Sequence, residues 1–284
     1  MNTRIEDVLN QTKLNWTVRE EAIVTASGIA IPERKALIRD DINKVLSVQG
    51  EGYQVYQNSQ LVELLDRVSS QVGLPIHSGG LFGDGKKVFV QMKSNDLKLG
   101  TDKVEGYITG INSFDGSTSL AFGPSNLTIS CQNTFFAVFK SLETRIKHTK
   151  NMELRIEDVC RGMEQALVEE VKMFETIKRL SEAEFGAKER ELTTKMLFNI
   201  GKDVKLNEIE AMSTVTKNRV SAFEADLLRE LKEKGNTLWG LFSGVTRYTT
   251  HSLGKIDSTE NKMFGVYGNR EREIFRGLSE LVGG

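Results

Sequence analysis

A glycine-rich segment followed by two lysines is the first place where residue types and spacing suggest chemistry. Gly80-Leu81-Phe82-Gly83-Asp84-Gly85-Lys86-Lys87 nearly matches the loop with which many nucleotide-binding proteins hold phosphates. That loop needs Ser or Thr after its lysine to hold Mg²⁺, and a helix that begins at the phosphates. Here Lys87 takes the Ser or Thr position, and the alternating residues 88–92 follow. The pattern favours a glycine-rich hairpin over ATP binding. A flexible hairpin tip whose lysines contact a phosphate backbone is a further interpretation.

A second basic segment, Arg145-x-Lys147-His148-x-Lys150, ends a stretch with helical periodicity. Cations at a helix end complement its carbonyl dipole, so a solvated helix end and an anion-binding site are equally open interpretations. If both basic segments share one face, they form a cationic groove. Exposed aromatic residues beside them would add a stacking surface for single strands. The predicted nucleic-acid contacts are Lys86, Lys87, Lys93, Arg145, Lys147, His148 and Lys150.

Other reactive side chains do not form a recognisable site. The three histidines, His77, His148 and His251, are far apart and have no ligand at zinc spacing. Cys131 and Cys160 are the only cysteines, and both are expected to be buried, unpaired thiols, as in a reducing cytosol. Neither Cys131 nor the Asp115-Gly116-Ser117 turn has a base at a fixed offset. We therefore predict no catalytic residue, no metal and no cofactor.

Composition limits the class of partner. The formal net charge of the 284 residues is -1, so no global field attracts nucleic acid or membranes, and any anion-binding surface must be local. No apolar run approaches the 18 residues that a membrane-spanning helix needs. The first residues contain acids and no apolar core, so no signal peptide is expected.

The first half of the chain shows mixed α+β patterning with mostly antiparallel pairing. Leu61, Leu64, Leu65 and Val68 form the apolar stripe of a helix that starts at Asn58 or Ser59 and ends at Gly73. Phe135, Val138, Phe139 and Leu142 predict another helix that starts near Asn133 or Thr134. The remaining predicted elements are a hairpin at 35–48, a hairpin at 74–93, a polar loop at 95–103, strands at 107–112, 118–122 and 127–130, and turns at 113–117 and 123–126.

The second half is predicted to be helical. One helix of about 25 residues begins near Ile156, since apolar residues recur there at spacings of three and four. Shorter helices follow, one stopped by Gly201, one by Gly235 and one capped by Thr237. The fold class is therefore α+β, an antiparallel β-meander with packed helices followed by a helical C-terminal half. The predicted domains are residues 1–150 and 151–284, with one antiparallel sheet in the first.

The sequence also resembles a known family. The resemblance lies in Leu14-Asn15-Trp16-Thr17-Val18, Lys35 to Asp41, Tyr53-x-x-Tyr56-Gln57-Asn58, Gly79-Gly80, Asn112 to Ser117, Cys131-Gln132-Asn133-Thr134, Ile146-Lys147-His148-Thr149, Thr237-Leu238-Trp239-Gly240 and Tyr248 to His251. These segments are similar to those of the phage- and plasmid-like proteins grouped as domain of unknown function nine-three-two. Phe114 stands where that pattern leads us to expect histidine, and Ser243 where it leads us to expect asparagine. The resemblance implies a phage or plasmid origin and a host-cytoplasmic setting, with no established activity.

The order of elements is also similar to the core of phage single-strand annealing proteins. This analogy implies a non-enzymatic, oligomeric protein that binds or anneals single-stranded DNA in recombination. Apolar positions for more than one neighbour on the helix at 155–180 fit self-association. The alternatives are a protein-interaction factor that acts on host machinery, and an enzyme that uses Cys131 or the glycine hairpin.

Overall fold

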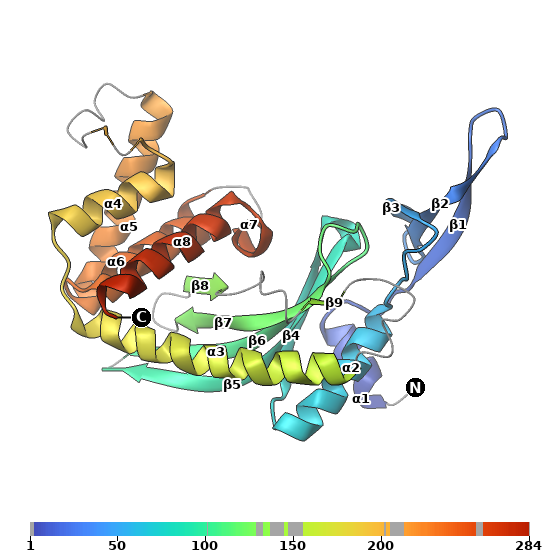
Figure 1. Ribbon diagram of the computed structural model, residues 1–284, viewed down its shortest axis with the longest axis horizontal. Coiled ribbons are helices and arrows are strands. Elements are labelled where there is room, and N and C mark those ends of the chain that lie inside the picture. The colour runs from blue at the N-terminus through green and yellow to red at the C-terminus, as the bar shows by residue number, and fades with distance from the viewer. Residues whose placement is uncertain are drawn as a thin grey trace. The chain divides into compact units, whose positions relative to one another are not determined.

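The computed structural model describes residues 3–100, 102–128, 133–136, 145–146, 156–201, 203–204, 213–253 and 258–283 (Figure 1). The chain forms two compact units. The first comprises Met1–Asn95, Tyr107–Pro124 and Val138–Val168, and the second Asp96–Gly106, Ser125–Ala137 and Glu169–Gly284. Each unit is therefore assembled from three separate segments. The sequence-based division near residue 150 stays a prediction.

The described residues form two antiparallel sheets, so the α+β class is confirmed and the prediction of one sheet is wrong. The three-stranded sheet has the order β1-β2-β3, with β1 (Val18–Val24), β2 (Ala30–Arg39) and β3 (Lys44–Gly50). The larger sheet has the order β4-β5-β6-β7-β8, and β9 also pairs with β7. Its strands are β4 (Ile76–Phe82), β5 (Lys87–Leu99), β6 (Asp102–Ser113), β7 (Leu120–Thr128), β8 (Asn133–Phe136) and β9 (Arg145–Ile146).

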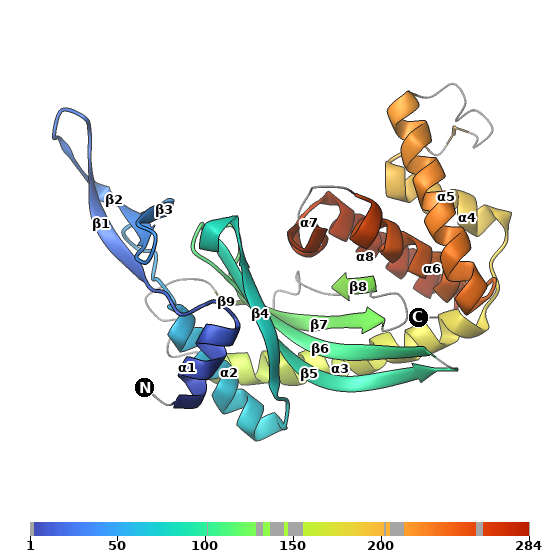
Figure 2. The same ribbon diagram turned by 180° about the vertical axis from the view of Figure 1, so that it is seen from behind.

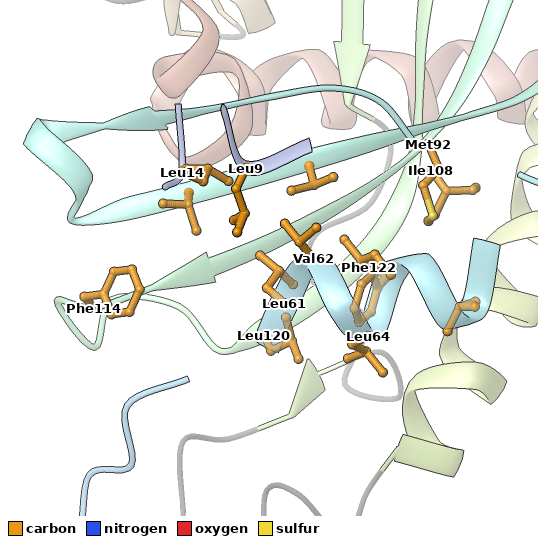
Figure 3. Packing of buried hydrophobic residues seen from close by; sticks show 14 of the residues in the cluster. Leu9, Leu14, Leu61, Val62, Leu64, Met92, Ile108, Phe114, Leu120 and Phe122 are labelled. Carbon is orange, nitrogen blue, oxygen red and sulfur yellow. The ribbon is translucent and has the colours of Figure 1, made fainter. Parts of the chain in front are cut away.

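Helices α1 (Thr3–Gln11) and α2 (Asn58–Val72) belong to the first unit. The predicted apolar stripe of α2 is buried, and Gly73 ends the helix in the left-handed conformation with φ 73°. The buried side chains of α2 pack with alternate residues of β5, namely Val88, Val90 and Met92. Figure 3 shows Leu61, Val62 and Leu64 of this helix beside Met92, Ile108 and Phe122. The face of the larger sheet that carries Val88, Val90 and Met92 is therefore buried in the core.

Three local predictions in the meander are wrong. The predicted helix near Asn133 is strand β8 over Asn133–Phe136, paired antiparallel with β7 (Figure 2). Phe135 lies 5.0 Å from both Phe242 and Phe275, ring centroid to ring centroid. Short apolar runs suit helix and strand alike, and here tertiary packing selects the strand. Residues 137–144, which include most of that predicted helix, lie outside the described residues.

The other two errors concern strand length. The expected polar loop at 95–103 is strand at both ends, because β5 continues to Leu99 and β6 begins at Asp102. The expected turn at 123–126 lies inside β7, which runs without a break from Leu120 to Thr128. Gly123 and Pro124 suggested a turn by their residue types. Pairing along β7 outweighed that local signal, since Ser125 and Asn126 lie opposite Phe136 and Phe135 of β8.

The second unit is mostly helical. Its elements include the C-terminal part of α3 (Ile156–Glu182), then α4 (Ala187–Phe198), α5 (Thr214–Lys234), α6 (Leu238–Arg247), the π-helical turn η5 (Tyr248–Ser252), α7 (Ser258–Phe264) and α8 (Val266–Leu281). Gly235 ends α5 and Thr237 caps α6 by accepting a 3.0 Å hydrogen bond from the Gly240 N–H, as predicted. Helix α4 ends at Phe198, and its C-cap is Asn199, with a φ of 55°, rather than the predicted Gly201.

Candidate nucleic-acid interface

The glycine-rich turn between β4 and β5 is a tightly held structural corner. Gly83–Gly85 forms one 3₁₀ turn, with Asp84 at φ 58° and Gly85 at φ 104°. A Cβ on Gly85 would come within 2.8 Å of the Trp16 ring, so only glycine fits both the conformation and the space. The Phe114 N–H donates to the Lys86 carbonyl at 2.7 Å and joins this corner to the end of β6. The geometry is that of a packed hairpin.

Cations around this corner are neutralised by acids. The Arg39 guanidinium donates two 2.7 Å hydrogen bonds to Asp41 and one of 3.0 Å to the Asp84 carbonyl, and lies 4.4 Å from the centre of the Trp16 ring. Lys44 pairs with the Asp84 carboxylate. The hydrogen bond and charge of Lys44 lower the pKa of Asp84, and those of Arg39 lower the pKa of Asp41. The corner therefore offers little excess positive charge beyond the exposed side chain of Lys86.

The second face of β4, β5 and β6 is polar and aromatic, and we call it the polar sheet face. Because side chains alternate along a strand, Lys87, Phe89, Gln91 and Lys93 point away from the core side chains of β5 and are half-buried. The polar sheet face comprises His77, Ser78, Phe82, Lys87, Phe89, Gln91, Lys93, Tyr107 and Thr109. Two of the predicted lysines thus lie on one strand face.

Contacts within the polar sheet face fix its side chains. The Phe82 and Phe89 rings stack with centroids 5.3 Å apart, and the His77 and Tyr107 rings lie 5.0 Å apart. The Lys93 Nζ lies 5.1 Å from the Tyr107 ring centre. These contacts arrange rings and a cation side by side, which is the combination that single-strand binding surfaces use.

A hydrogen-bonded chain crosses the same face. The Ser78 hydroxyl donates to Gln91 Oε1 at 2.9 Å, and Gln91 Nε2 donates to the Thr109 hydroxyl at 3.2 Å. At the end of the face, Lys87 Nζ lies 3.7 Å from the Asp115 carboxylate, and both side chains are mostly buried. Lys87 is therefore partly neutralised, and Lys93 Nζ donates to the Ser94 carbonyl at 3.3 Å.

The sheet topology places the backbone of Arg145 at the same end of the sheet as Lys86 and Lys87. Ala121 pairs with Arg145, and Leu120 with Ile146. Three strand spacings separate β5 from β9, so the two backbones lie about 14 Å apart. The groove shared by the two basic segments stays a prediction. Lys147, His148 and Lys150 lie outside the described residues.

Segments that carry the family resemblance meet in the first unit, which sequence reasoning did not predict. The Gln57 side chain forms two hydrogen bonds with the Val18 backbone, at 2.9 and 2.7 Å. Asn112 donates to the Tyr56 carbonyl at 3.0 Å, and Tyr53 donates to the Ser113 carbonyl at 2.6 Å. Burial, and secondarily the charge of Asp115, raise the pKa of Tyr53. The side chains tie backbone segments together, so their role here is structural.

The two departures from the family pattern are both buried. Phe114 is fully buried in the core of the first unit, with its ring centroid 5.5 Å from that of Trp16. This side chain therefore contributes packing and cannot transfer a proton. Ser243 is 1% exposed, and its carbonyl accepts 3.1 and 3.0 Å hydrogen bonds from Asn133 and Thr246. The Ser243 hydroxyl and Asn133 Oδ1 have no hydrogen-bond partner in the described part of the chain. Asparagine at position 243 would add an amide donor and acceptor beside them.

The remaining reactive side chains can be located only in part. Within them no group of three or more His, Cys, Asp or Glu side chains could hold a metal ion. Cys131 and Gln132 lie outside the described residues, as does the side chain of Cys160. None of the helices in the described part of the chain combines the length and apolarity that crossing a membrane requires.

Comparison with known proteins identifies the family. A model of the family described as a domain of unknown function (DUF932) matches residues 45–264, more than half of the chain. The chain belongs to this family. No curated protein and no solved structure matches the chain. Within the DUF932 match lie the glycine corner, the polar sheet face and most of the helical unit, whereas Trp16 and Val18 precede it.

Proposed function

We propose that this DUF932 protein binds single-stranded nucleic acid through the polar sheet face. The observation that carries the proposal is the row Lys87, Phe89, Gln91 and Lys93 on one face of β5, with the His77 and Tyr107 rings beside it. In this proposal the protein is a non-enzymatic, oligomeric annealing factor of phage or plasmid recombination that works in the host cytoplasm.

The physical argument combines stacking with local charge. Bases have π-faces that stack on aromatic rings irrespective of sequence, at about 1–3 kcal/mol per base. Phe89 and His77 retain exposed surface for such contacts, whereas Phe82 and Tyr107 are buried. Lys87 and Lys93 are six positions apart, about 20 Å along a strand, so they would bracket the stacked bases. A net charge of -1 favours a binding site confined to such a surface.

The test replaces Lys87 and Lys93 with Ala and measures binding to single-stranded DNA at several salt concentrations. Two lost phosphate contacts should reduce the magnitude of the salt slope by about 1.4, since each contributes about 0.7 for a single strand. The matched control is Lys188→Ala with Lys232→Ala, which removes two exposed charges from helices α4 and α5. Equal affinity and slope in the folded double variant and the control would refute the proposal.

A protein-interaction factor is the second candidate, and exposed apolar side chains of the three-stranded sheet favour it. Val45 and Val48 of β3 are 52% and 51% exposed, and Ile42 before them is 50% exposed. Val24 and Ile29 flank the tip of the β1–β2 hairpin with 58% and 66% exposure. Replacing Val45 and Val48 with Thr should leave DNA binding unchanged if the first proposal is right. Loss of self-association in light scattering by this variant would assign the surface to oligomer contacts.

A further inference from the structure

The far end of the β1–β2 hairpin is apolar and exposed, and we call residues 23–31 the hairpin tip. Residues 22–32 contain no charged side chain, although 27% of the whole chain is charged. Within the tip, Val24 and Ile29 are 58% and 66% exposed. Strand β3 pairs with β2 only over residues 34–39, so the hairpin extends past it (Figures 1 and 2). A contiguous apolar surface in solvent marks an interaction site.

Hydrogen bonds within the hairpin tip hold its shape. The Thr25 N–H donates to the Ile29 carbonyl at 2.8 Å, and the Ile29 N–H donates to the Thr25 hydroxyl at 3.1 Å. The Gly28 N–H donates to the Thr25 carbonyl at 2.9 Å, with Gly28 in the left-handed region at φ 82°. A surface that is already ordered loses little conformational entropy when a partner covers it.

The same sheet has a second exposed apolar surface, which we call the valine face. Side chains of directly opposed residues lie on one face of an antiparallel pair. Val45 opposes Ile38, and Val48 opposes Ala36, and these four residues form the valine face. Leu37 lies on the other side of the sheet and is buried in the core of the first unit. The valine face therefore points away from that core, and its two valines are 52% and 51% exposed.

The spacing of the two surfaces along β2 lets two copies of the chain cover both at once. The hairpin tip is centred on β2 near Ala30 and Ile31, and the valine face is centred near Leu37. When two copies lie antiparallel with tip over valine face, the two-fold axis passes midway, between Glu33 and Arg34. Glu33 of one copy then lies opposite Arg34 of the other, and both side chains belong to exposed residues. Apolar surfaces alone set this register, and it brings opposite charges together.

We propose that two copies of this chain form a symmetric dimer in which the hairpin tip of each packs on the valine face of the other. A two-fold arrangement of this kind is closed, because each copy contributes the same patch and receives the same patch. It uses both exposed apolar surfaces of the sheet, and the net charge of -1 causes little repulsion between copies.

The size of the sheet limits the strength of this dimer. Strand β2 has ten residues. At about 3.4 Å per residue and about 4.8 Å per strand, one face of the three-stranded sheet measures roughly 34 by 14 Å. Two such faces bury roughly 1,000 Å², which is the size of weak or transient interfaces. We therefore expect a dimer that dissociates in the micromolar range.

Two other contacts compete with this arrangement. A lipid surface is a poorer partner for the hairpin tip, because Glu21 and Glu33 flank it and anionic headgroups attract bases. Self-association through α3 is the second alternative, since Val168 and Val171 of that helix are 54% and 50% exposed. Variants of each surface separate self-association through the sheet from self-association through α3.

The experiment is sedimentation velocity of the full chain at several micromolar concentrations. The tip variant is Val24→Thr with Ile29→Thr, and the face variant is Val45→Thr with Val48→Thr. Each should raise the dimer Kd at least about tenfold, because both contacts of the dimer lose buried apolar side chains. The control is Val215→Thr with Val266→Thr, which removes two equally exposed valines from α5 and α8 and should leave the Kd unchanged.

Mixing and charge exchange test the symmetric arrangement. An equimolar mixture of the tip variant and the face variant should associate more tightly than either variant alone, because one contact of the mixed dimer keeps both native surfaces. Glu33→Arg alone should weaken the dimer, since arginines then face each other across the axis. Adding Arg34→Glu should restore it, which a merely structural defect would not allow.

Three results would overturn the proposal. The first is a wild-type protein that stays monomeric at every concentration, and the second is a mixture no tighter than its separate components. The third is loss of association in Val168→Thr with Val171→Thr while the tip variant still associates. None of these results bears on DNA binding by the polar sheet face, which belongs to the other sheet.

Discussion

Two lysine–carboxylate pairs in this protein have the same chemistry and opposite surroundings. In the second unit, Lys262 Nζ lies 2.9 Å from Glu271, and the two side chains are 0% and 1% exposed. In the first unit, Lys44 pairs with Asp84 at the glycine corner, where the side chains are 51% and 58% exposed. Water solvates the side chains of the exposed pair in the folded and in the unfolded protein. The buried pair depends on neighbouring residues for all of its hydrogen bonds.

The neighbours of the buried pair confirm that dependence. Lys262 donates to the Thr250 and Thr249 hydroxyls at 2.7 and 3.1 Å, and Thr249 also bonds Glu271. Burial raises the pKa of Glu271, and the charge of Lys262 opposes that rise. The network joins η5, α7 and α8, so it orders the C-terminal part of the helical unit. The comparison shows that the contribution of an ion pair to folding stability can be judged only when the burial of both partners is known.

The largest effect should come from breaking the buried pair. Lys262→Met leaves Glu271 without its cation, and we expect a loss of about 3–5 kcal/mol of unfolding free energy. Urea denaturation at neutral pH measures it. Adding Glu271→Leu should restore part of the loss, because the uncompensated carboxylate is then removed. A single variant as stable as the wild type would show that the pair is exposed in solution.

The glycine corner should be sensitive to shape, although its charges matter little. In Gly85→Ala, the alanine would have to adopt a φ of 104°, and its Cβ would lie only 2.8 Å from the Trp16 ring. Backbone strain and overpacking each cost about 1–3 kcal/mol, so we expect a loss of at least about 2 kcal/mol in denaturation. Gly277→Ala is the control, since this glycine lies within α8 with open space around it. Alanine should be neutral or stabilising there, and equal losses in both variants would contradict the assignment.

The smallest effect should come from the exposed pair, and it should depend on pH. Lys44→Met is expected to leave the denaturation midpoint nearly unchanged at pH 7. Because Lys44 lowers the pKa of Asp84 below its ordinary value of 3.8, the small stabilisation exists above that value and disappears as pH falls through the lowered pKa. The difference between wild type and variant should therefore vanish in strong acid. A large difference at neutral pH would mean that the pair is desolvated.

Local signals in the sequence determined the elements whose ends are chemically marked. Helix α2 ends at Gly73 because a left-handed terminal residue favours glycine. The break between α5 and α6 follows from Gly235 and Thr237 for similar reasons. The alternation in β5 already implied two faces, and the structure shows which of them meets α2. Each of these features depends on interactions within a few residues, which is why the sequence alone sufficed.

Tertiary structure decided everything that depends on a distant partner. Asn133–Phe136 is a strand because β7 and the phenylalanines of α6 and α8 surround it, although its own spacing suited a helix. Lys44 and Lys87 face acids 40 and 28 positions away in the chain. The sequence by itself determined the residue types, the two-faced strands and the helix ends. Only the fold determined which charges are neutralised, because Coulomb energy depends on separation and burial in space rather than on spacing along the chain.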